Sequence, residues 1–139
     1  MMKRATGTAP ALTRCVMTGV LSACGWAILC AAVIAKLLDE EVITMDSLGY
    51  CAMAAHVSAV VIGALTAKSG AGHMAGAAMG IAGAGYYLCL LLVNLLFFGG
   101  RYKGLGTTLV LVVLALGAVY LTEGKGRAVA GRKRYKIPR

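Results

Sequence analysis

The chain has 139 residues, of which 60% are hydrophobic and 14% charged, and its formal net charge is +9. A soluble domain carries about 25% charged residues, so this composition excludes an ordinary soluble protein and indicates one membrane domain. A transmembrane helix needs about 20 apolar residues, and four segments meet that need: 15–38, 47–67, 74–98 and 105–121. Backbone polar groups in lipid must be bonded internally. We therefore expect an all-α integral membrane four-helix bundle with short loops.

Small residues recur at every fourth position of the first span, at Gly19, Ala23 and Ala27. The second span repeats this spacing at Ala59 and Gly63. Small side chains allow the backbones of neighbouring helices to approach closely in lipid. We therefore expect small-residue helix packing between these two spans.

A similar ladder runs from the turn before the third span into that span, at Gly72, Gly76 and Gly80. A short turn at 68–73 joins it to the second span, which makes the two spans an antiparallel hairpin. We expect the ladder to pack against the small residues of the first two spans. The fourth span is bulky and β-branched over 109–116, so we expect it to lie at the periphery.

Four polar side chains fall within the spans, at His56, Tyr86, Tyr87 and Asn94. By depth, His56 could pair with either tyrosine. One interpretation is that these residues line a small polar site or a proton-linked pathway. The other is that they form hydrogen bonds between helices. We favour the second interpretation, because a transport site usually also needs a charged group.

The sequence predicts no enzyme, no cofactor and no metal site. All five acidic residues lie outside the spans, so no serine within a span has a carboxylate that could complete a catalytic triad. The five cysteines include no C-x-x-C pair, and we predict neither disulfides nor metal ligation.

Basic residues predict the orientation in the membrane. Of 14 Lys and Arg, three (Lys36, Arg101 and Lys103) would lie outside if both termini are cytoplasmic, which leaves eleven inside. This bias predicts an N-in/C-in topology. Residues 1–13 would form a cytoplasmic N-terminal segment, 14–123 the transmembrane domain, and 124–139 a basic cytoplasmic tail.

The tail contains glycines, so we expect it to be flexible beyond about Gly126. It follows a membrane span directly, and Tyr135 is its one aromatic residue. These features favour attraction to anionic lipid head groups over nucleic-acid binding.

The sequence GALTAK at 63–68, followed by GHMAGAAMG at 72–80 and by Tyr86 and Tyr87, resembles the YrzE-like family of small four-span membrane proteins of Firmicutes. The fourth span departs from the family pattern, because a Leu/Val run and a basic tail replace a glycine-rich ending. The resemblance implies a protein of the bacterial cytoplasmic membrane, and it brings no catalytic residues to carry over.

Two classes of function fit these observations. The first is a structural or accessory subunit that acts through helix–helix contacts, as a homo-oligomer or a hetero-oligomer. The second is a small transporter, a channel or a holin-like pore that uses the polar residues at His56, Tyr87 and Asn94. The small-residue stripes and the absence of charge within the spans favour the first class.

Overall fold

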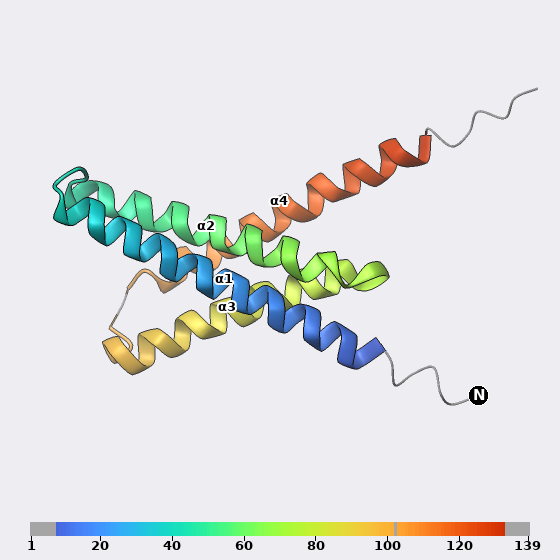
Figure 1. Cartoon of the computed structure of the whole chain (residues 1–139), viewed down its shortest axis with the longest axis horizontal. Coiled ribbons are helices and arrows are strands. Elements are labelled where there is room, and N and C mark those ends of the chain that lie inside the picture. Colours follow the sequence, from blue (N-terminus) through green and yellow to red (C-terminus); the bar gives the residue numbers. More distant parts are fainter. Residues whose placement is uncertain (1–7, 102, 133–139) are drawn as a thin grey trace, which may run out of the picture.

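The computed structural model describes residues 8–101 and 103–132, and it is 89% helical. The elements follow in the order α1 (Thr8–Asp39), α2 (Met45–Ser69), a short 3-10 helix η1 (Gly72–Met74), α3 (Ala75–Phe98) and α4 (Leu105–Arg132) (Figure 1). All four α-helices are long and apolar enough to cross a membrane. The predicted all-α, four-helix membrane fold is confirmed.

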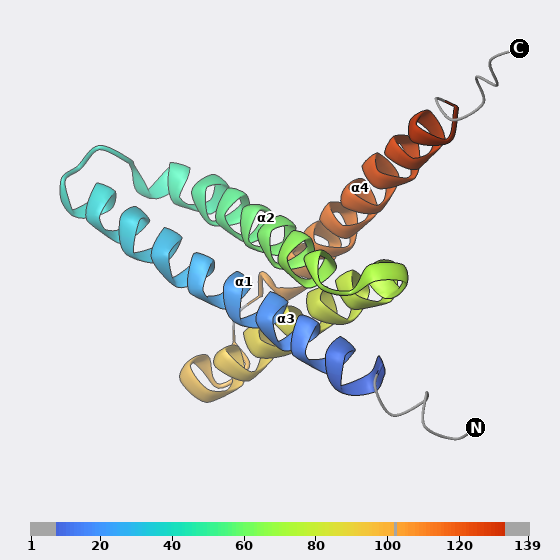
Figure 2. The same ribbon diagram turned by 45° about the vertical axis from the view of Figure 1, so that its right-hand side comes forward.

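The helices form two hairpins that cross each other. α1 and α2 run side by side and antiparallel, and they share the most extensive interface in the molecule. α3 packs against both of them, whereas α4 packs mainly against α2 and α3. Figure 2 shows the last turns of α4 running away from the other helices. The prediction that the fourth helix is peripheral therefore agrees with these last turns alone, because Val112 and Ala115 of α4 belong to the main buried cluster.

Both outer helices are longer than their apolar segments. α1 already begins at Thr8. Pro10 does not prevent this start, because it falls in the first turn, where a helix tolerates proline. α4 continues to Arg132, so the expected flexibility beyond Gly126 is wrong over that stretch. Glycine weakens a helix without forbidding it. The rest of the predicted tail, 133–139, lies outside the described residues.

Small side chains fill the interior, and large ones face outward. Ala59, Ala67 and Ala78 are fully buried, while Ile28 and Leu96 are largely exposed. This is the arrangement expected in lipid, which solvates aliphatic side chains and gives helices little hydrophobic reason to associate. The helices are therefore held by close backbone packing and by hydrogen bonds between side chains.

Candidate functional sites

The backbones of α1 and α2 approach each other closely around Gly19 and Gly63. A Cβ added at Gly19 would lie 2.7 Å from the Cβ of Ala67 and 2.8 Å from the carbonyl oxygen of Gly63. A Cβ added at Gly63 would lie 2.8 Å from the Cβ of Ala23 and 2.9 Å from the carbonyl oxygen of Gly19. These separations leave no room for any side chain, so the two backbones touch through their glycines.

The remaining small residues of these two stripes lie next to this contact. Ala59 is buried, and Ala27 packs against the main apolar cluster, which also contains Val60, Tyr86 and Val112. The structure thus brings the small residues predicted for the first and second spans into one interface.

The glycine ladder of the third span lies elsewhere. Gly72 has a φ of +54° and forms part of the turn between α2 and α3, which is a conformation that favours glycine. Gly80 is exposed, and no atom lies within 4 Å of the position that its Cβ would take. Gly76 is also exposed, and its added Cβ would meet only the ring of Tyr120, at 3.2 Å. The ladder does not pack against the stripes of α1 and α2, contrary to the expectation.

The face that α3 turns inward follows a different spacing. Its buried residues Ala75, Met79, Ala82 and Tyr86 are separated by four, three and four positions. These steps average about 3.7 residues, close to the 3.6 residues of one helical turn, so the four side chains stay on one face of the helix. Gly76 follows Ala75 and Gly80 follows Met79 by one position, which turns each glycine by about 100° around the helix axis from that buried face. Both glycines therefore face outward.

One polar contact links α2 to α3 within the membrane segment. The Nδ1 atom of His56 lies 2.9 Å from the hydroxyl oxygen of Tyr86, and the two ring centroids are 6.3 Å apart. Tyr86 is 1% exposed, while His56 is half-buried. The structure thus selects Tyr86 from the two tyrosines that could have paired with His56.

Tyr87 and Asn94 do not join this pair. The hydroxyl of Tyr87 donates to the carbonyl oxygen of Leu105, at 3.2 Å, and so ties α3 to the start of α4. Asn94 is buried, and its Oδ1 atom has no hydrogen-bond partner among the described residues. The four polar residues therefore do not form the single site that the sequence suggested.

A further polar contact was not predicted. The indole N–H of Trp26 on α1 donates to the hydroxyl of Ser58 on α2, at 3.0 Å. The sequence could have indicated this contact, because the single tryptophan lies in the middle of the first span. An indole N–H in an apolar setting needs a hydrogen-bond acceptor. With this contact, each pair of consecutive helices is linked by at least one side-chain hydrogen bond between described residues.

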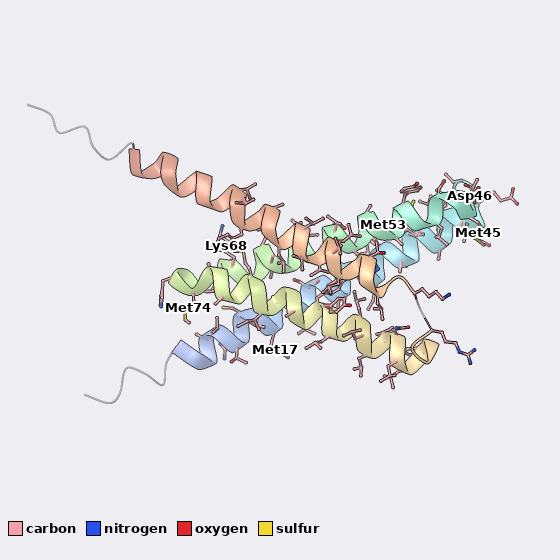
Figure 3. The ribbon with its side chains drawn as sticks, turned by 180° about the vertical axis from the view of Figure 1, so that it is seen from behind. Met17, Met45, Asp46, Met53, Lys68 and Met74 are labelled. Carbon is pink, nitrogen blue, oxygen red and sulfur yellow. The ribbon has the colours of Figure 1, made fainter. Side chains whose placement is uncertain are left out.

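Charged side chains gather at the ends of the hairpins. Figure 3 places Asp46 at one end and Lys68 at the opposite end, next to the turn between α2 and α3. At the first end, Lys36 forms an exposed ion pair with Glu40, at 3.7 Å. Within the described part of the chain, no three His, Cys, Asp or Glu side chains are grouped so that they could hold a metal ion.

No family model, no curated protein and no solved structure matches this chain. The resemblance to the YrzE-like family therefore stays a prediction from sequence. The described residues of this small membrane protein form four apolar helices.

Proposed function

We propose that this protein is a structural or accessory subunit that binds a transmembrane helix of a partner protein. The binding surface is the α3 outer face, which we define as Gly76, Ala77, Gly80 and Ala84, all of them exposed. The observation that carries the proposal is the open space at Gly80, where nothing lies within 4 Å of the position of a Cβ.

Packing within this chain does not explain a glycine at position 80. Glycine within a helix costs about 1 kcal/mol relative to alanine, and an alanine at this position would meet no atom of the chain. Helices in lipid associate where small residues let their backbones come close. The α3 outer face offers such a surface, and the exposed side chains of Ile81 and Leu88 lie beside it.

The orientation in the membrane follows from the basic residues, and we place the protein in the bacterial cytoplasmic membrane. The start of α1 and the end of α4 lie toward the same end of the molecule (Figure 1). Lys68 lies at that end, whereas the acidic loop after α1 lies at the other. Lys and Arg favour the cytoplasmic side, which supports the N-in/C-in topology and a tail near anionic lipid head groups.

Affinity capture from native membranes tests this proposal when it is done with two matched variants. Gly80→Leu places a bulky side chain on the α3 outer face, where no atom of the chain lies within 4 Å of the new Cβ. Gly25→Leu makes the same exchange at an exposed position of α1 that also has no atom within 4 Å. We expect a partner that Gly80→Leu loses and Gly25→Leu keeps. A partner that both variants keep, or capture of further copies of this chain alone, would contradict the proposal.

A small transporter, a channel or a holin-like pore is the second candidate, and the His56–Tyr86 contact is the observation that favours it. A titratable side chain within a membrane segment is often functional. The purified protein in liposomes tests this candidate through ion or proton flux. Flux that His56→Ala abolishes, in a protein that keeps its helical content, would favour this candidate over the accessory subunit.

A further inference from the structure

A groove runs between α1 and α2 in the half of the hairpin that is nearer to their connecting loop. Its volume is about 300 Å³, and its walls are almost entirely apolar. Leu38 and Leu48 line it near the loop, and Ala27 and His56 line it near the middle of the two helices. From residue 27 to residue 38 a helix rises about 16 Å, so the groove is long and narrow.

One wall of the groove is open to the surrounding membrane. Ala31 and Ala35, which line it from α1, are exposed. Ligand pockets usually have volumes of about 300–1,000 Å³, so this groove suits a slender molecule.

His56 is the polar group of the groove, and Tyr86 fixes the orientation of its ring. The Tyr86 hydroxyl is buried, and its only partner among the described residues is Nδ1 of His56. A buried hydroxyl proton without an acceptor is unfavourable, so we assign the hydroxyl as donor and Nδ1 as acceptor. A neutral imidazole that accepts at Nδ1 carries its proton on Nε2.

The Nε2–H group of His56 is free to bind something. No described residue pairs with it. Among the described side chains, Asn94 Oδ1 is the polar atom that is both fully enclosed and unpartnered. Because Nε2 has no partner either, it must be reachable from outside the protein. His56 is the one lining residue whose side chain carries a polar atom. We therefore place this donor at the inner end of the groove, with hydrocarbon walls along the rest of its length.

We propose that this groove binds a neutral, membrane-dissolved molecule that has a slender hydrocarbon body and a carbonyl oxygen at one end. The carbonyl accepts a hydrogen bond from Nε2–H of His56, and the hydrocarbon body extends toward the loop along Ala31 and Ala35. A carboxylate is disfavoured, because no Lys or Arg lines the groove and an unpaired charge in hydrocarbon is costly. An alkane would leave the donor unpaired.

Nuclear magnetic resonance of the histidine side chain tests this site directly. The chain has two histidines, so His73→Asn leaves His56 as the one labelled side chain when the protein is produced with ¹⁵N-histidine. The probes are methyl nonyl ketone and undecane, which have the same chain length and differ in the carbonyl group. We expect the ketone to shift the Nε2 and Nε2–H resonances saturably, and we expect undecane to cause no such shift.

Two further variants separate the groove from unspecific partitioning into the lipid. Ala31→Phe fills the groove, whereas Ala32→Phe adds the same bulk at an exposed neighbour that does not line it. We expect the saturable shift to disappear in Ala31→Phe and to persist in Ala32→Phe. Should circular dichroism show that Ala31→Phe does not fold, Ala35→Phe fills the outer part of the groove instead.

The proposal would be overturned by no saturable shift with the ketone, by equal shifts with the ketone and undecane, or by an unchanged shift in the variant that fills the groove.

A comparison of ether-linked with ester-linked lipids distinguishes the two possible sources of the carbonyl group. In bilayers of ether-linked lipids the ketone has no competing ester carbonyl. Weaker binding in ester-linked lipids would identify an acyl ester as the natural ligand, and equal binding would identify a free lipophilic carbonyl compound.

Discussion

Replacing Gly63 with alanine should push α1 and α2 apart at their closest contact. The new Cβ would lie 2.8 Å from the Cβ of Ala23 and 2.9 Å from the carbonyl oxygen of Gly19. Carbon atoms pack best at about 3.5–4.0 Å, so the helices must separate locally by roughly 1 Å. Neither obstacle can rotate away, because one is a backbone oxygen and the other is the first atom of a side chain.

The magnitude follows from two opposing terms. Overpacking of this kind costs about 1–3 kcal/mol. Alanine in place of glycine also favours the helix by about 1 kcal/mol, which offsets part of that cost. Gly80→Ala is the matched control, because it gains the same helix preference at an exposed position with no atom within 4 Å. Subtracting the two effects leaves the packing term alone.

The assay is reversible unfolding of the purified protein in mixed micelles, followed by far-ultraviolet circular dichroism. We expect Gly63→Ala to be less stable than Gly80→Ala by about 1–3 kcal/mol. Equal stabilities for the two variants would refute the reasoning, because they would mean that α1 and α2 do not touch through their glycines.

Three further exchanges probe the polar contacts and the orientation. Tyr86→Phe removes the hydrogen bond to His56 and should lower the unfolding free energy by about 0.6 kcal/mol, and by no more than about 1.7 kcal/mol; no loss in the same unfolding assay would argue against the contact. Asn94→Leu removes an enclosed oxygen that has no described partner, so it should raise stability by on the order of 1 kcal/mol, and a loss would reveal a partner. In a cysteine-free background on intact cells, an impermeant maleimide should label Val42→Cys, while His73→Cys should react only after permeabilisation; the reverse pattern would contradict the N-in/C-in topology.

Much of the architecture could be predicted from the sequence, because lipid imposes simple rules. Unbroken apolar runs of membrane length favour helices, and the four observed helices contain the four predicted segments except for Met74, which falls in η1. The contact between Gly19 and Gly63 lies within the two stripes that the spacing indicated.

The inward face of α3 could not be predicted in the same way. This helix is so rich in glycine and alanine that more than one of its faces is smooth, and the ladder at Gly76 and Gly80 was the more conspicuous. The buried face instead contains Met79 and Tyr86, and the partner of Tyr86 is His56, which lies 30 positions away in the sequence. Which face of α3 is buried depends on how two helices cross. The spacing of residues within one helix carries no information about that crossing.

The two proposed sites are independent, because no residue of the α3 outer face lines the groove. The α3 outer face would bind another helix by close backbone contact, whereas the groove between α1 and α2 would bind a single slender molecule through His56. A partner captured through Gly80 would say nothing about the groove. A ligand seen at His56 would likewise leave the partner helix untested.

Site-specific photo-crosslinking in native membranes tests whether the α3 outer face binds a helix of another protein. A photo-reactive diazirine amino acid is placed at Ala84 on the α3 outer face, and in a second protein at Ala32 on the exposed side of α1. We predict a discrete protein adduct from position 84, containing a different polypeptide, and lipid adducts alone from position 32. Lipid adducts alone from both positions would contradict the proposal that α3 binds a partner helix.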